Sequence, residues 1–166
     1  MEIRRLSESD LTAFAEHFGE GNPAQLERAL QLQAEDAAVM LVAWRYGLPV
    51  GRVILHWRPI PEAPAEWNSG VCFPEEFIVL TPYRSQGIGT ALMDEAERLT
   101  RVRGYERVSI GVGLDNGRAL ALYKRLGYEE TGLGPFEDGG SFYDHAGRLI
   151  EWQETWTFVT KRLCRT

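Results

Sequence analysis

Apolar residues along the chain follow two patterns in turn: short β-type runs and longer stretches with helical spacing. The runs 38–44 and 50–57 are rich in β-forming residues, and the Gly47, Leu48 and Pro49 between them predict a hairpin turn. Asn22-Pro23 is typical of a helix start, because Asn caps and Pro fits the first helical position. The whole pattern predicts strands at 3–6, 38–44, 50–57, 76–80, 108–112, 128–131 and 152–163. It predicts helices at 11–18, from Pro23 through Ala34, at 87–102 and at 117–126.

Two segments lack either pattern. Residues 59–70 carry three prolines and predict an irregular loop, and the glycine-rich stretch 132–147 is also expected to be a loop. The four tryptophans that fall in predicted strands are expected in the core; they are Trp44, Trp57, Trp152 and Trp156.

Length and composition indicate an ordinary globular protein. The 166 residues fit one domain, and a net charge of −6 argues against nucleic acid or an anionic membrane as the main partner. Cys72 and Cys164 lie far apart, so neither a disulfide framework nor a cysteine-rich metal site is indicated. The N-terminus lacks the apolar stretch of a signal peptide. A soluble, cytoplasmic protein is therefore expected.

The segment 78–90 is the most informative part of the chain. An apolar run ends at Thr81-Pro82, and a basic, glycine-bearing loop leads directly into an amphipathic helix. This order gathers main-chain N–H groups, a helix N-terminus and Arg84, an arrangement that favours a di-anionic phosphate group. The loop is not a nucleotide P-loop, because no Lys-Ser or Lys-Thr follows the glycines. It also lacks the third glycine of the dinucleotide-binding fingerprint.

This segment contains the first of two motifs that resemble, in sequence and in their order along the chain, those of the GNAT family of N-acetyltransferases. The first is Arg84-x-x-Gly87-x-Gly89 after Leu80-x-Pro82, which is similar to the family's acetyl-CoA-binding motif. The second lies downstream at the right separation and comprises Asn116, Ala119, Leu122, Tyr123, Leu126, Gly127 and Tyr128. The two motifs span residues 76–128.

The resemblance implies a single α/β domain, 1–166, with a central mixed, mostly antiparallel sheet of about six or seven strands. Helices would cover both faces, and the parallel strands 76–80 and 108–112 would splay apart. It further implies direct acetyl transfer from acetyl-CoA to a primary amine of a small molecule or protein. The residues it implies for acetyl-CoA binding are Ile78, Val79, Leu80, Arg84, Ser85, Gln86, Gly87, Ile88, Gly89, Thr90, Asn116 and Tyr123.

Such a reaction requires two proton transfers, one from the amine and one to the leaving thiolate. An alkylamine is neutral in only roughly one molecule in a thousand at pH 7, so a base must take its proton. Tyr123 resembles the family's general acid for the leaving thiolate, although it could instead simply pack on its helix. Position suggests Glu76 as the base, and Glu75 or water are the alternatives. Strict alternation places Glu76 on the face of Ile78, and a bulge in this strand would exchange the two carboxylates.

The acceptor and the assembly are less well defined. Acidic residues in predicted loops would suit a cationic amine; they are Glu62, Glu66, Glu137, Asp138 and Asp144. Trp67, Tyr143, Asp144 and His145 could shape the acceptor site. The isolated histidines 17, 56 and 145 are expected to be surface or packing residues. A non-catalytic acyl-CoA sensor and a phosphate-binding structural module are alternatives, and a homodimer formed through the C-terminal strand is possible.

Overall fold

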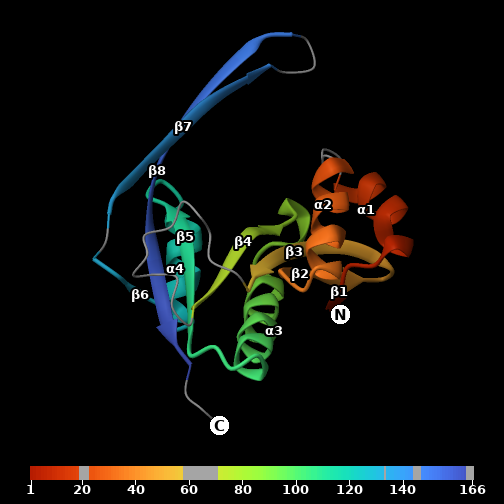
Figure 1. Ribbon diagram of the computed structural model, residues 1–166, viewed down its shortest axis with the longest axis horizontal. Coiled ribbons are helices and arrows are strands. Elements are labelled where there is room, and N and C mark those ends of the chain that lie inside the picture. Colours follow the sequence, from red (N-terminus) through yellow and green to blue (C-terminus); the bar gives the residue numbers. More distant parts are fainter. Residues whose placement is uncertain (19–22, 58–70, 133, 144–146, 164–166) are drawn as a thin grey trace. The chain divides into compact units, whose positions relative to one another are not determined.

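The computed structural model describes residues 1–18, 23–57, 71–132, 134–143 and 147–163, which divide into two compact units. The first unit holds the described residues of Met1–Ser109 and Arg162–Thr166, and the second holds Ile110–Lys161. Figure 1 labels the elements. Those of the first unit are β1 (Glu2–Arg5), η1 (Glu8–Asp10), α1 (Leu11–Phe18), α2 (Pro23–Ala34), β2 (Ala38–Arg45), β3 (Leu48–His56), β4 (Val71–Val79), η3 (Thr81–Tyr83), α3 (Ile88–Val102) and the start of β5 (Arg107–Gly113). The second unit holds the rest of β5, α4 (Gly117–Arg125), β6 (Glu129–Glu130), β7 (Phe136–Tyr143) and nearly all of β8 (Leu149–Arg162).

The strand order confirms the predicted mixed, mostly antiparallel sheet. In the first unit β1, β2, β3 and β4 pair antiparallel in that order, and β4 pairs parallel with β5 through Val71↔Arg107 and Cys72↔Val108. In the second unit β8 lies between β5 and β6, and β7 pairs antiparallel with β8. The described residues thus form eight strands, where about six or seven were expected.

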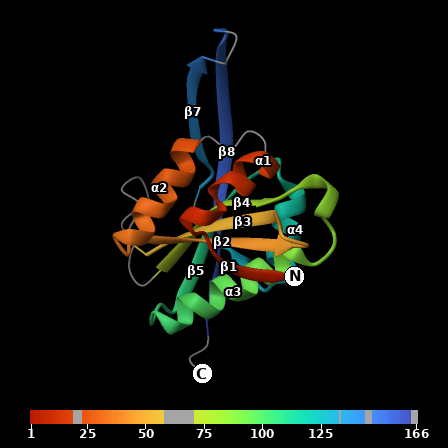
Figure 2. The same ribbon diagram turned by 90° about the vertical axis from the view of Figure 1, so that its right-hand side faces the viewer.

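Helices cover both faces of the first unit's sheet, as Figure 2 shows. Alternate residues of β2 point to opposite layers: Val39 and Leu41 join a buried cluster with α3, whereas Met40 and Val42 join a cluster with α1 and α2. A strand that is buried on both sides needs a nearly continuous apolar sequence, because neither face can carry polar residues. This requirement explains the unbroken apolar run of β2.

The glycine-rich stretch 132–147 was expected to be a loop, and this expectation was wrong. Residues Phe136–Tyr143 form β7, and β8 begins at Leu149, three residues before the predicted start at Trp152. Gly140 is paired with Trp152, and a Cβ on Gly140 would lie 3.2 Å from the indole Nε1. Glycine here allows an aromatic ring to lie over the strand and does not mark a turn. Trp152 itself is 43% exposed, so it is not a core residue as predicted.

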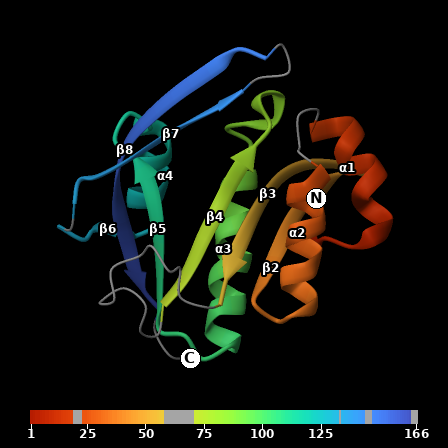
Figure 3. The same cartoon turned by 45° about the horizontal axis from the view of Figure 1, so that its top comes forward.

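Strand β4 also begins earlier than predicted, at Val71 instead of Glu76. Its extra residues pair with the end of β3, for example Leu55↔Pro74. Figure 3 shows β4 running to the connection that leads into α3. The longer strand therefore fixes the start of this connection within the first unit's sheet.

The absence of a side chain at Gly51 allows the start of α3 to pack closely against the sheet. A Cβ at this position would lie 3.1 Å from both the Ile78 carbonyl oxygen and Leu92 Cδ1, and 3.3 Å from Ile88 Cγ2. Any side chain would therefore push the first turns of α3 away from β3 and β4.

We expect Gly51→Ala to destabilise the protein by about 1–3 kcal/mol, because an added methyl group overpacks this contact. Gly117→Ala is the matched control, since a Cβ there would meet no atom within 4 Å. It should be neutral or stabilising by up to about 1 kcal/mol. Urea denaturation of the two variants measures the difference, and equal midpoints would contradict the packing argument.

Candidate functional site

The connection between β4 and α3 is a tight turn with two left-handed residues. After β4 ends at Val79, the short helix Thr81–Tyr83 reverses the chain. Ser85 (φ 61°) and Gly87 (φ 81°) then adopt positive φ values. Backbone of this kind turns successive N–H groups toward one side, which makes a concave anion-binding surface. The connection thus has the tight, glycine-bearing turn that was expected between the strand and the helix.

The N-terminus of α3 opens onto this turn. Gly87 is the N-cap and supplies no side-chain cap, and the first helical hydrogen bond runs from Ala91 N to Gly87 O (3.0 Å). The N–H groups of the first turn have no acceptor within the helix. A Cβ on Gly87 would meet no atom within 4 Å, so the space in front of the turn is open. The buried Ile88 side chain anchors this turn in the core, and only its main chain faces the loop.

Three polar side chains hold the loop in place. Arg84 Nε donates to the Val79 carbonyl (2.9 Å), and Gln86 Nε2 donates to the Pro82 carbonyl (3.0 Å). Arg45 Nη1 donates to Gln86 Oε1 from the end of β2. Arg45 was not identified from the sequence, because 41 residues separate it from its partner and only the fold brings them together.

Strand β4 contains a bulge between Glu75 and Ile78. Arg52 pairs with Ile78 and Ile54 with Glu75, so β4 has one more residue than β3 over this stretch. Glu76 carries the irregularity with φ 48°. The strict alternation expected from the sequence is therefore wrong here, because a bulge lets two consecutive side chains point to one face.

Both carboxylates face the α1 and α2 side of the sheet, but they have different partners. Glu76 Oε2 lies 2.9 Å from Nη2 of Arg52, whose side chain is only 7% exposed, and burial lowers the pKa of this guanidinium. Glu75 Oε2 lies 3.0 Å from His56 Nε2. This histidine, together with a smaller effect of Arg28, holds the pKa of Glu75 below its usual value. His56 is therefore not isolated as predicted, and its partner could be found only with the register of the bulged strand.

Asn116 and Tyr123 lie in the second unit, on α4. The Asn116 side chain caps the helix by accepting a hydrogen bond from Ala119 N (3.1 Å). Tyr123 is 3% exposed, and its ring centroid lies 5.8 Å from that of Tyr128. Burial raises the pKa of the Tyr123 phenol well above its ordinary value. The phenol is thus protonated at neutral pH.

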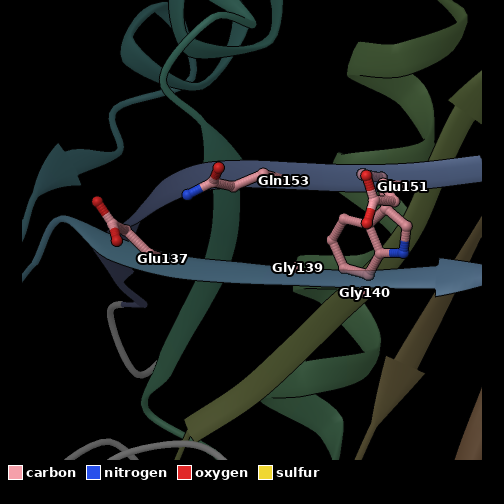
Figure 4. A pocket seen from close by; sticks show the side chains of 6 residues that line it. Glu137, Gly139, Gly140, Glu151 and Gln153 are labelled. Carbon is pink, nitrogen blue, oxygen red and sulfur yellow. The ribbon is translucent and has the colours of Figure 1, made fainter.

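An acidic and aromatic hollow lies on the β7–β8 hairpin of the second unit (Figure 4). It has a volume of about 710 Å³ and is lined by Glu137, Gly139, Gly140, Glu151, Trp152 and Gln153. Tyr143 is the last residue of β7. Asp138 also lies in β7. The remaining acceptor-site residues considered from the sequence lie outside the described part of the chain: Glu62, Glu66, Trp67, Asp144 and His145.

Within the described ranges, no group of three or more His, Cys, Asp or Glu side chains could hold a metal ion. No helix in the same residues has both the length and the apolar character needed to cross a bilayer.

Comparison with known proteins identifies the family. The sequence model of the acetyltransferase (GNAT) family matches residues 3–128, so the chain belongs to this family. Over 55 residues it is 44% identical to an uncharacterized N-acetyltransferase of Methanocaldococcus jannaschii, a match that spans 33% of this chain and 24% of that protein. The resemblance inferred from the two motifs is thus confirmed, as is the enzyme class to which the family's members belong.

Solved structures agree with this assignment. A ribosomal-protein-alanine N-acetyltransferase from Brucella melitensis has a TM-score of 0.73 at 22% identity and covers 98% of this chain and 100% of its own. An aminoglycoside 6′-N-acetyltransferase from Acinetobacter haemolyticus has a TM-score of 0.66 at 25% identity. This match covers 82% of this chain and 96% of the other. The first likeness shows the fold, and both agree with the predicted fold class.

We expect Glu76→Gln to lower stability by about 1–3 kcal/mol, because it leaves the Arg52 charge buried without its counter-charge. The matched variant Glu75→Gln should cost about 1 kcal/mol or less, since the Glu75 side chain is 46% exposed. Urea denaturation at neutral pH compares the two. Equal losses would contradict the different burial of the two ion pairs.

Proposed function

We propose that the protein is an acetyl-CoA-dependent N-acetyltransferase that moves the acetyl group directly to a primary amine of a small molecule or protein. The observation that carries the proposal is the open, left-handed turn into α3, flanked by Arg84, in a chain of the GNAT family. A diphosphate is the ligand group that such a helix N-terminus favours, because N–H groups and the helix dipole both act on it.

In this proposal the N–H groups from Ser85 to Thr90 and the guanidinium of Arg84 bind the coenzyme's diphosphate. Main-chain groups of Ile78 and Val79 bond the amides of the pantetheine arm. Leu80 contributes less to binding of the pantetheine arm than the sequence predicted, because its N–H group already donates to the Val50 carbonyl at 3.0 Å.

Glu75 is the better base of the two carboxylates. Glu76 is paired with the buried Arg52 guanidinium and is 31% exposed, whereas the Glu75 side chain is 46% exposed and more open to an incoming amine. Glu75 takes the proton of the ammonium group, and the freed nitrogen attacks the thioester carbonyl. The C–N bond forms, the C–S bond breaks, and the Tyr123 hydroxyl donates a proton to the departing thiolate.

A cationic amine is the acceptor class that we favour. The hollow on the β7–β8 hairpin combines the carboxylates of Glu137 and Glu151 with the exposed ring of Trp152, and both kinds of group attract cations. The similarity to an aminoglycoside 6′-N-acetyltransferase points the same way. An amine panel for assay therefore includes polyamines and aminoglycosides beside basic peptides and neutral amines.

Arg84→Gln should weaken CoA binding about 10- to 100-fold, because a charge-assisted contact to phosphate is lost. Isothermal titration calorimetry measures the change. The control is Arg98→Gln, which removes an exposed arginine of α3 that pairs with Glu95. Binding of acetylpantetheine, which lacks the diphosphate, should not depend on Arg84. An unchanged CoA affinity would refute the role of this loop.

Tyr123→Phe should lower kcat at least about 10²-fold with little change in the KM for acetyl-CoA, because only the proton donor is removed. A thiol-release assay measures both constants. Tyr128→Phe, the partner ring in the same aromatic pair, is the control and should retain activity. Tight acetyl-CoA binding without thiol release from any amine would instead indicate an acyl-CoA sensor.

A further inference from the structure

His56 and Glu75 form a carboxylate–imidazole pair that the fold assembles from two strands. His56 is the last residue of β3, and its Nε2 lies 3.0 Å from Glu75 Oε2 of β4. The Nε2 atom is buried, whereas the side chain as a whole is 19% exposed. Glu75 keeps 46% of its side-chain surface open. The carboxylate can therefore meet a ligand while the imidazole lies behind it.

The bulge at Glu76 is what creates this pair. With strict alternation, Glu75 would share the face of Phe77 and Val79, which pack into the α3 cluster. With the bulge, Glu75 pairs across the sheet with Ile54, on the same face as His56. Two acids thus stand on one face, and each has its own partner: the Arg52 guanidinium for Glu76 and the His56 imidazole for Glu75.

Charged groups around the pair come from each element that packs on this face. Arg28 of α2 acts on Glu75, and Arg52 and Glu76 form the neighbouring ion pair on β3 and β4. The Arg52 guanidinium lies 5.8 Å from the ring of Phe14 and 5.7 Å from that of Phe18, both on α1. These surroundings favour the ionised form of Glu75, so the carboxylate is in the state that can accept a proton.

We propose that His56 is a positioning residue that orients Glu75 for removing a proton from the acceptor amine. This inference rests on the proposed acetyl transfer and deepens it. An N–H bond of the ammonium breaks and an O–H bond forms on Glu75, leaving the electron pair on nitrogen. The proton then leaves Glu75 for solvent through the exposed part of the carboxylate, while the contact with His56 keeps the side chain in place.

The test compares pH profiles of kcat/KM for the wild type, His56→Gln, Glu75→Gln and the double variant. Glu75→Gln should lower kcat about 10²-fold, and His56→Gln about tenfold. His56→Gln should also move the acidic limb of the profile, which Glu75 sets, to higher pH, because the contact with His56 lowers the pKa of Glu75. In the Glu75→Gln background His56→Gln should change little, because it acts through Glu75. His17→Gln, at the other described histidine, is the control and should keep the wild-type profile.

A second measurement needs no activity. The carboxyl ¹³C resonance of Glu75, followed by NMR across pH, should titrate at higher pH in His56→Gln than in the wild type, since the contact with His56 lowers the pKa of Glu75. A resonance that does not move would overturn the proposal. An unchanged pH profile of an active His56→Gln enzyme, or additive effects in the double variant, would overturn it as well. If the wild type released no thiol with any amine, the proposed function itself would fail.

Discussion

The extra residue of β4 at Glu76 is the constraint on which the candidate site depends. Strict alternation would send Glu75 into the apolar cluster under α3, where an ionised carboxylate would lose its hydration. The bulge turns Glu75 to the other face, while Phe77 and Val79 stay in the α3 cluster. One inserted residue thus reconciles a buried apolar strand with two acids on a single face.

This arrangement has an energetic cost that its partners offset. A non-glycine residue with φ near 48° is strained by an amount of order 1–3 kcal/mol. The Arg52 guanidinium is buried beside it, and its charge would be costly without an acid at 2.9 Å. Arg52 therefore needs Glu76, and Glu76 reaches Arg52 through the strained backbone. The same pairing occupies Glu76 and leaves Glu75 to the imidazole.

The turn and α3 could be predicted because their signals lie within a few residues of each other. The contacts between residues far apart in the sequence could not, because they depend on the register of the strands. Thr81-Pro82, Gly87 and the helical spacing after it all act within a few residues, and α3 begins at Ile88, one residue from its expected start. By contrast, the contacts of His56 with Glu75 and of Arg45 with Gln86 depend on how strands align in space. Gly139 and Gly140 misled the prediction of β7 because glycine serves both turns and close approaches, and only the position of Trp152 distinguishes the two.

The bond from Arg84 to Val79 bears on how the loop would receive an anion. Val79 lies in the stretch of β4 proposed to bond the pantetheine arm. An arginine bound to its carbonyl could therefore be regarded as an obstacle to coenzyme binding. A guanidinium, however, has five N–H donors in a fixed plane, and only Nε donates to another of the described residues. Arg84 can keep this bond and present its outer nitrogens to a diphosphate. The bond then fixes the plane of the guanidinium before the ligand arrives, which reduces the side-chain entropy lost on binding. In a protein with a net charge of −6, such a pre-oriented cation supplies locally the attraction that the overall charge opposes.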